Sequence, residues 1–113
     1  MRIIEVKEDK KQYLDLLFLA DEQENMIDRY LDKGKMYVLD DNANKCECIV
    51  TDEGNDVLEI KNIATVPDYQ GKGYAKSLID FIVEKYREQY AILQVGTGDS
   101  PLTIPFYEKC GFV

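Results

Sequence analysis

The sequence contains no histidine and only three cysteines, so several familiar catalytic and metal-binding arrangements are excluded. Without histidine, a catalytic base has to be a carboxylate or a water chain, and zinc sites that combine cysteine with histidine cannot form. The cysteines are Cys46, Cys48 and Cys110, and an odd number without a C-x-x-C pair is typical of reduced, structural thiols. The sequence therefore predicts no metal site.

The chain also has little positive charge and no long apolar run. Its 14 Lys and Arg face 22 Asp and Glu, which gives a net charge of −8, and only three of the cations are arginines. Nucleic-acid surfaces need clustered cations, so this balance disfavours such a partner. No apolar run approaches the roughly 20 residues that span a bilayer, and residues 1–6 alternate as a strand rather than a signal peptide. We expect a cytoplasmic protein with neither a nucleic-acid nor a membrane partner.

What is present suits one folded domain over residues 1–113. Apolar residues make up 45% of the chain and charged residues 32%, as in a globular protein with a single core. The apolar spacing predicts a strand at 2–6, a helix at 10–20, and a second helix capped by Asp21 or Asn25 and ended by Gly34. Further along, it predicts a hairpin of strands 36–39 and 46–51, a strand at 57–66, a helix from about 73, a strand at 90–95 and a last helix at 101–109. This order indicates an α+β fold.

The most informative segment is a glycine-rich turn at residues 66–75, V-P-D-Y-Q-G-K-G-Y-A. It joins the strand ending at Val66 to the helix beginning near Gly73. Glycine permits positive φ and has no Cβ, so several amide N–H groups can converge on one anion at the positive end of the helix dipole. Lys72 and Lys76 add local positive charge. We therefore expect a phosphorylated cofactor here.

The spacing excludes two common nucleotide motifs. The dinucleotide fingerprint G-x-G-x-x-G fails because position 76 is Lys76, and the P-loop pattern is absent. Residues 70–75 instead match the Q/R-x-x-G-x-G/A signature of the GNAT N-acetyltransferase superfamily. Residues 58–66 resemble the strand that precedes this signature, residues 95–100 resemble a subgroup of small bacterial acetyltransferases, and residues 106–112 are similar to the family's Y-E-K-x-G-F element. The resemblance covers roughly residues 57–113.

The resemblance implies a fold, a cofactor and a reaction. The fold is a mixed, mostly antiparallel central sheet flanked by helices, and the reaction is transfer of an acetyl group from acetyl-CoA to a primary amine of a small molecule by direct attack. The glycine turn would hold the pyrophosphate, and the backbones of Ala64 and Val66 would bind pantetheine. Ser100 stands where many relatives have asparagine, and a hydroxyl reaches less far. The implied cofactor residues are Ala64, Val66, Gln70, Gly71, Lys72, Gly73, Tyr74, Ala75 and Ser100.

Two catalytic residues follow from the same resemblance. Tyr107 occupies the position of a tyrosine that protonates the departing thiolate, which suits a phenol of pKa near 10. Alternatively, Tyr107 is a core residue of the last helix. Glu59 lies where some relatives hold a base, and its alternative is a solvated residue opposite Lys61. Asn62 is a second polar group that can position water. Cys110 is disfavoured as a nucleophile because no base accompanies it.

Acidic residues on the second helix and its approach would suit a cationic acceptor amine, but a solvated acidic face is the favoured explanation. These residues are Asp21, Glu22, Glu24, Asp28 and Asp32.

Members of the family usually continue past the G-F element with two further strands, so the resemblance predicts a C-terminally truncated domain. Two functions remain open on this reading. One is an N-acetyltransferase whose site is completed by an omitted segment or a second copy in a homodimer. The other is a catalytically reduced domain that binds acyl-CoA or a protein partner.

Overall fold

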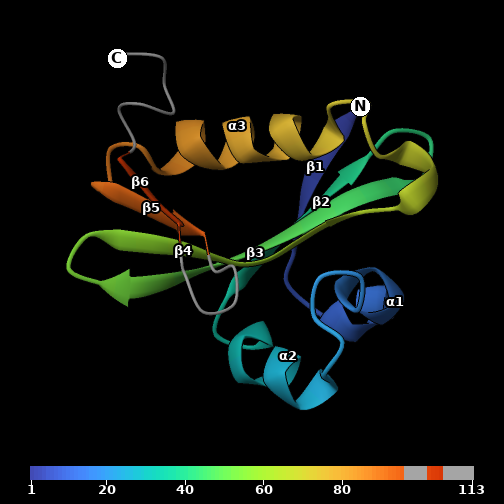
Figure 1. Ribbon diagram of the computed structural model, residues 1–113, viewed down its shortest axis with the longest axis horizontal. Helices are drawn as coiled ribbons and strands as arrows, with labels where there is room; N and C mark the ends of the chain where they lie inside the picture. The colour runs from blue at the N-terminus through green and yellow to red at the C-terminus, as the bar shows by residue number, and fades with distance from the viewer. Residues whose placement is uncertain (96–101, 106–113) are drawn as a thin grey trace.

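One mixed sheet organises the protein. The structure is a computed structural model that describes residues 1–95 and 102–105, and these form a six-stranded sheet in the order β1-β2-β3-β4-β5-β6. Helix α3 covers one face of the sheet, and α1 and α2 lie against the other (Figure 1). This confirms the predicted α+β class, with a mostly antiparallel sheet flanked by helices. None of the helices among the described residues is long and apolar enough to cross a membrane.

The strands follow the predicted order, with one addition. Neighbouring strands pair antiparallel except β4 and β5, which are parallel. The expected hairpin is confirmed as the antiparallel pair β2 and β3. The bounds are β1 Arg2–Val6, β2 Lys35–Asp40, β3 Asn44–Gly54, β4 Val57–Thr65, β5 Ile92–Val95 and β6 Leu102–Pro105.

The last strand corrects the prediction of a helix at 101–109. Residues 102–105 form β6, which pairs with β5 from Val95↔Leu102 to Ile92↔Pro105. The β-branched Thr103 and Ile104 favour this extended conformation. Proline cannot donate to a ladder, but at the end of an outer strand it is tolerated. The remainder of the predicted helix lies outside the described residues.

The first predicted helix is shorter than expected. In place of one helix over 10–20, the chain forms the 3-10 turn η1 Lys10–Tyr13 and the short helix α1 Leu14–Leu17. Its last turn tightens because Leu19 and Ala20 each donate to a carbonyl three residues back, at 3.2 Å, and such bonds commonly end a helix.

The remaining helices agree better with the prediction from the sequence. They are α2 Glu24–Leu31, the 3-10 turn η2 Pro67–Tyr69, and α3 Tyr74–Tyr86. The N-cap of α2 is Gln23, and the expected capping residue Asp21 instead accepts a hydrogen bond from the Gln23 amide at 3.2 Å.

Side-chain alternation divides the core into two layers. Cys46, Cys48 and Val50 of β3 pack with α3, whereas Ile49 packs with the buried residues of α1 and α2. Both cysteines are buried and free, in line with the prediction of reduced thiols on one face. The two helical layers are thus held to opposite faces of one sheet.

A one-residue bulge interrupts this alternation in β4. Ile49 pairs with Asn62 and Val50 pairs with Ile60, so Lys61 has no partner on β3. The extra residue turns Asn62 toward α1 and α2 while Ile60 faces α3. The parallel neighbour β5 pairs with β4 only from Val57 to Ile60. No described residue therefore pairs with the β5-facing edge of residues 61–65.

Gly34 is required by close packing between α2 and β3. A Cβ at this position would lie 2.7 Å from Ile49 Cγ2 and 2.8 Å from the carbonyl oxygen of Tyr30. The carbonyl is fixed because it accepts a 2.8 Å hydrogen bond from the Gly34 amide.

We expect Gly34→Ala to lower the free energy of unfolding by about 1 to 3 kcal/mol, because the added methyl overpacks this contact. Urea denaturation measures the change. Asp32→Ala, at an exposed neighbouring position, is the control and should stay within about 0.5 kcal/mol of the wild type. Equal stability of the Gly34 and Asp32 variants would contradict the packing argument.

Candidate acetyl-CoA site

The predicted glycine turn connects β4 to α3 with two residues in the left-handed region. Gly71 has φ 78 and Gly73, the N-cap of α3, has φ 86. A Cβ added at either glycine would have no atom within 4 Å. Glycine is therefore needed here for its backbone conformation, and it leaves open space in front of the turn.

The amide groups of this turn are available to a ligand. The first intrahelical bond of α3 is donated by the Ser77 amide to the Gly73 carbonyl at 3.0 Å. Within the described part of the chain, the amides of residues 71–76 donate to no backbone carbonyl outside the helix, and Gly73 provides no side-chain cap. Unpaired amides at the positive end of a 13-residue helix form an anion site.

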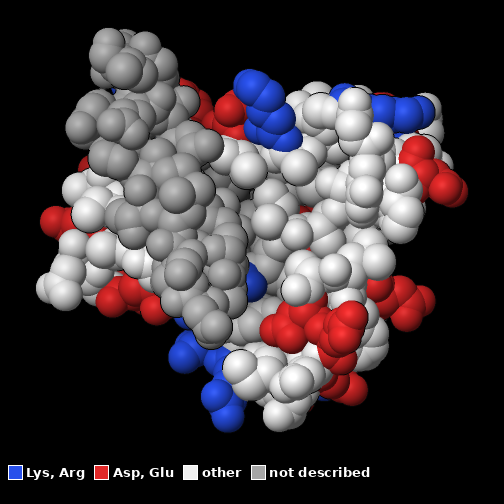
Figure 2. Space-filling view, viewed as in Figure 1, with Lys and Arg blue, Asp and Glu red and all other residues white. Residues whose placement is uncertain are grey.

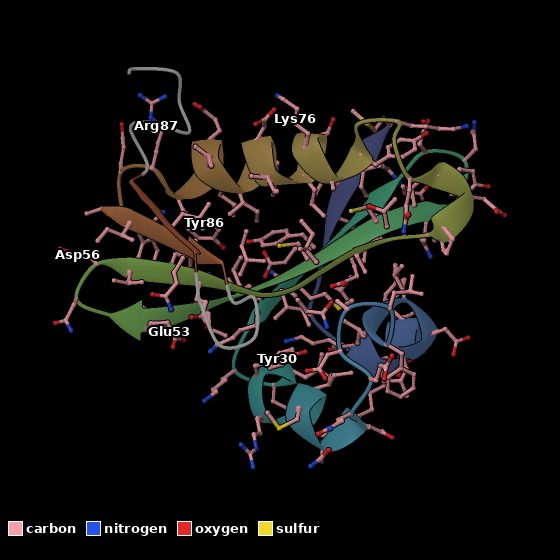
Figure 3. All side chains as sticks on the ribbon, in the orientation of Figure 1. Tyr30, Glu53, Asp56, Lys76, Tyr86 and Arg87 are labelled. Atoms are coloured by element: carbon pink, nitrogen blue, oxygen red, sulfur yellow. The ribbon has the colours of Figure 1, made fainter. Side chains whose placement is uncertain are left out.

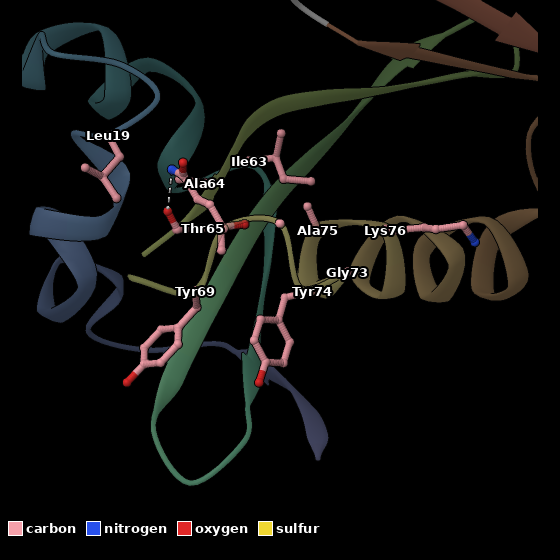
Figure 4. Close-up of a pocket in the computed structure, with 11 residues that line it drawn as sticks. Leu19, Ile63, Ala64, Thr65, Tyr69, Gly73, Tyr74, Ala75 and Lys76 are labelled. Atoms are coloured by element: carbon pink, nitrogen blue, oxygen red, sulfur yellow. Dashed lines mark hydrogen bonds between the residues drawn. The ribbon is translucent and has the colours of Figure 1, made fainter. Parts of the chain in front are cut away.

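A pocket of about 330 Å³ lies in front of these amides (Figure 4). Leu19, in the turn that follows α1, borders it on one side, and β4 and the start of α3 border it on the other. Six of the expected cofactor residues line it, whereas Val66 and Lys72 do not. The lining residues are Leu19, Ile63, Ala64, Thr65, Tyr69, Gln70, Gly71, Gly73, Tyr74, Ala75 and Lys76.

The backbone groups on the open edge of β4 belong to the residues next to Ala64 and Val66, which were the expected partners of pantetheine. The Val66 amide donates to the Lys45 carbonyl at 2.9 Å, and the Val66 carbonyl accepts from the Tyr69 amide at 2.8 Å. In an antiparallel ladder the direction of the backbone groups alternates, so Ala64, opposite Glu47, also turns toward β3. The backbone groups of Ile63 and Thr65 face the open edge, which favours them over Ala64 and Val66 as partners of an extended ligand.

Gln70, the first residue of the signature, closes the turn. Its side-chain Nε2 donates to the Thr65 carbonyl at 3.3 Å, drawn as a dashed line in Figure 4. This contact ties the turn to the end of β4, and it places the Thr65 carbonyl on the edge away from β3, as the ladder alternation requires.

Aromatic and cationic side chains lie beside the pocket, and sequence reasoning missed Lys45 and Tyr69 among them. Lys45 Nζ is 3.4 Å from the centre of the Tyr69 ring, and Lys72 Nζ is 5.8 Å from it, both within the range of cation–π attraction. The Tyr74 hydroxyl donates to Asp41 at 2.9 Å, and this bond is the main cause that raises the pKa of Tyr74. Lys45 belongs to a strand distant in sequence from the turn, so only the fold reveals its position.

Glu59, the expected base, is buried in a charged cluster. It accepts a hydrogen bond from Gln94 Nε2 and forms an ion pair with Lys61, whose ammonium also lies 3.6 Å from Glu53. Burial lowers the pKa of Lys61, but the hydrogen bonds and charges of Glu59 and Glu53 outweigh it, so the net shift is upward. The Lys61 cation therefore stays charged and holds Glu59 in place.

Asn62 lies on the α2 side of the sheet, in a polar chain. Its Nδ2 donates to the Leu17 carbonyl at 3.2 Å and to the Tyr30 hydroxyl at 3.0 Å, and Tyr30 donates to Asp21 at 3.2 Å. Burial, partly offset by the Asn62 bond, raises the pKa of Tyr30 to about 12. Asn62 Oδ1 is buried and has no partner among the described residues, which leaves one acceptor for a water molecule.

Two residues of the expected site, Ser100 and Tyr107, lie outside the described residues, as does the disfavoured nucleophile Cys110. Their assigned roles stay predictions.

The chain matches known acetyltransferases in sequence and in fold. A family described as an acetyltransferase (GNAT) domain matches residues 32–113. The chain is 33% identical over 117 residues to YvbK, an uncharacterized N-acetyltransferase of Bacillus subtilis, and the match spans 99% of this chain and 74% of YvbK. The chain belongs to the GNAT family of acetyltransferases, which are acyltransferase enzymes.

Solved structures of acetyltransferases have a similar fold. A GNAT family acetyltransferase from Elizabethkingia anophelis with acetyl-CoA bound is 30% identical with a TM-score of 0.78, over 88% of this chain and 66% of that one. An IAA acetyltransferase from Bacillus cereus is 30% identical with a TM-score of 0.79, over 96% and 74%. A Bacillus subtilis acetyltransferase in complex with CoA is 29% identical with a TM-score of 0.78, over 97% and 74%. The chain thus spans about two thirds to three quarters of these relatives.

Glu47 is a second buried carboxyl group, which the sequence did not reveal. It is 0% exposed, and neither side-chain oxygen has a partner among the described residues. Burial raises the pKa of Glu47 well above its ordinary value, because an uncompensated charge is costly in the core. The signal in the sequence was a glutamate between two buried cysteines.

Glu47 should make the protein less stable as the pH rises. Above the ordinary glutamate pKa the unfolded chain loses this proton and the folded chain keeps it, so the free energy of unfolding falls by up to about 1.4 kcal/mol per pH unit until the raised pKa is passed. Glu47→Gln should remove this slope in urea denaturation measured from acid to neutral pH.

The control is Glu88→Gln, at an exposed position of the chain, which should leave the slope unchanged. Parallel pH curves for the wild type and Glu47→Gln would show that Glu47 does not titrate abnormally.

Proposed function

We propose that this protein is an acetyl-CoA-dependent N-acetyltransferase that transfers an acetyl group to a primary amine of a small molecule by direct attack. The observation that carries the proposal is the row of unpaired amides at residues 71–76, beside the open edge of β4. Relatives with acetyl-CoA or CoA bound support the same cofactor. The expected cytoplasmic location stays a prediction.

Two sets of backbone groups suit two parts of this cofactor, the pyrophosphate and the pantetheine arm. The amides of residues 71–76 suit the pyrophosphate, because they are donors at a helix N-terminus. The edge groups of Ile63 and Thr65 suit the amide-containing pantetheine arm, which can add to β4 as a strand would. Lys72 adds positive charge nearby, whereas Lys76 is engaged by Asp80 at 2.9 Å. An acidic protein thus relies on local dipoles to hold a polyanion.

Acetyl-CoA supplies an activated acyl group as a thioester. Before attack, the acceptor ammonium loses a proton, and Glu59 takes it directly or through water held near the free Asn62 Oδ1. The amine nitrogen then bonds to the acyl carbon while the carbon–sulfur bond breaks. Tyr107 gives its proton to the departing thiolate, and the second proton that the nitrogen loses on becoming an amide restores the Tyr107 hydroxyl through solvent, so the products are an acetamide and the free thiol. Each role is that of a positioned acid or base.

One observation favours the alternative of a catalytically reduced acyl-CoA-binding domain. Glu59 is already engaged by Lys61 through one side-chain oxygen and by Gln94 through the other. Release of free thiol from acetyl-CoA across a panel of primary amines separates the two functions, since a binding domain releases none above the no-amine rate.

The acidic residues of the second helix do not support the expected cationic acceptor. Lys11 Nζ lies 2.9 Å from both Glu24 and Asp28, and Asp21 accepts hydrogen bonds from Gln23 and Tyr30. Three of these acids are thus engaged within the protein.

Gly71→Ala should weaken acetyl-CoA binding by tenfold or more in calorimetric titration, because the methyl group would enter the open space in front of the amides. Gly54→Ala is a matched control: Gly54 has φ 80 and a Cβ added to it would also have no atom within 4 Å, but it lies in the distant β3 turn. Both variants carry similar backbone strain, so only loss of the ligand site distinguishes them. Equal affinities for the two variants would contradict the cradle.

Tyr107→Phe should lower turnover by about a hundredfold at neutral pH, with acetyl-CoA affinity unchanged, because removal of a general acid slows thiolate departure. Release of thiol with a reactive amine measures turnover. Tyr13→Phe, which removes a hydroxyl on η1, is the control and should keep the wild-type rate. Unchanged turnover in Tyr107→Phe would exclude the general-acid role.

A further inference from the structure

A second pocket lies on the α2 side of β4, next to the charged cluster of Glu59. Its volume is about 360 Å³, and its walls come from α2, the turn that follows α2, and the hairpin of β3 and β4. Tyr30 and Glu53 lie on this side of the sheet in Figure 3. The lining residues are Met26, Arg29, Tyr30, Lys33, Glu53 and Lys61.

Two of the three cations that line this pocket have no acidic partner among the described residues. Lys61 is paired with Glu59 and Glu53, but within residues 1–95 and 102–105 neither Arg29 nor Lys33 forms an ion pair. Two unpaired cations in one pocket stand out in a chain of net charge −8. The pocket therefore has room and positive charge for an anionic group.

Helical spacing directs these side chains together. Met26, Arg29, Tyr30 and Lys33 follow the i, i+3, i+4, i+7 pattern, so they share one face of α2 and its following turn. In Figure 2, Lys and Arg side chains lie at the lower left of the molecule, where α2 meets the β3–β4 hairpin in Figure 1, with acidic side chains on either side of them. Arg29 and Lys33 thus lie together in the wall of the pocket.

The pocket also has the right position for an acceptor. It meets β4 at Lys61, whereas the cofactor pocket meets β4 at residues 63–65. Two residues of strand span about 7 Å, which is about the distance between the carboxylate and the terminal amine of an extended lysine. An acceptor anchored at Arg29 and Lys33 can therefore present its amine near Ile63 and the proposed base Glu59.

We propose that this pocket binds the carboxylate of an acceptor that carries both an amine and a carboxylate, so the substrate class is amino acids. The proposal rests on the proposed acetyl transfer for its catalytic meaning. The planar guanidinium of Arg29 suits a carboxylate through paired hydrogen bonds, and Lys33 adds a second charge. Met26 and the Tyr30 ring offer apolar contact to the rest of the ligand.

The test compares direct binding of amino acids with amines that lack only the carboxylate: lysine with cadaverine, phenylalanine with phenylethylamine, and histidine with histamine. Calorimetry without acetyl-CoA measures each affinity. For at least one pair, we expect the wild type to bind the amino acid about tenfold more tightly, the effect of one charge-assisted contact. The double variant Arg29→Gln with Lys33→Gln should remove this preference.

Lys85→Gln, which removes one cation at an exposed site on α3 across the sheet, is the control and should keep the preference. Absence of a carboxylate preference in every pair, or its persistence in the double variant, would overturn the proposal. If Arg29 and Lys33 only offset the negative end of α2, their loss lowers thermal stability and leaves the preference unchanged. Failure to bind acetyl-CoA would instead contradict the proposed function, because this comparison contains no acetyl-CoA.

Discussion

The site depends on the single unpaired residue in β4, Lys61. Because Lys61 has no partner on β3, the side-chain alternation shifts by one, and Glu59 and Asn62 face α2 while Ile60 and Ile63 pack toward α3. The parallel pairing with β5 ends at Ile60, one residue before the bulge. A regular strand would turn Asn62 into the apolar layer under α3, where its amide would lack partners.

The same irregularity brings the two proposed ligands together. Beyond the bulge, the free edge of β4 continues into the glycine turn and the N-terminus of α3, which form the cofactor pocket. At the bulge, Lys61 borders the second pocket and holds Glu59. The sheet also buries polar atoms at a cost in stability. The side-chain oxygens of Glu47 and Asn62 have no partners among the described residues. Such costs are expected where function rather than stability selects the residue.

The sequence predicted the parts whose signals are local. The glycine turn and the helix after it were recognisable because Gly71 and Gly73 precede a regular apolar pattern, and the order of strands followed from alternation. The bulge was missed, although the apolar spacing changes from two to three residues between Leu58, Ile60 and Ile63. The roles of Lys45 and Arg29 depend on contacts between distant segments, which no local pattern encodes. The strand at 102–105 was missed because Pro101 resembles a helix start, and the partner strand decides its conformation.

The central claim is that the bulge and the end of β5 pairing leave the backbone of Ile63 and Thr65 free for the cofactor. Residue-resolved amide hydrogen exchange, with and without CoA, tests it most directly. In the free protein the amides of Ile63 and Thr65 should exchange quickly while Ala64 and Val66 are protected by β3, and CoA should protect Ile63, Thr65 and the amides of residues 71–76. Protection of Ile63 and Thr65 without CoA, or no change at these residues when CoA binds, would contradict the account.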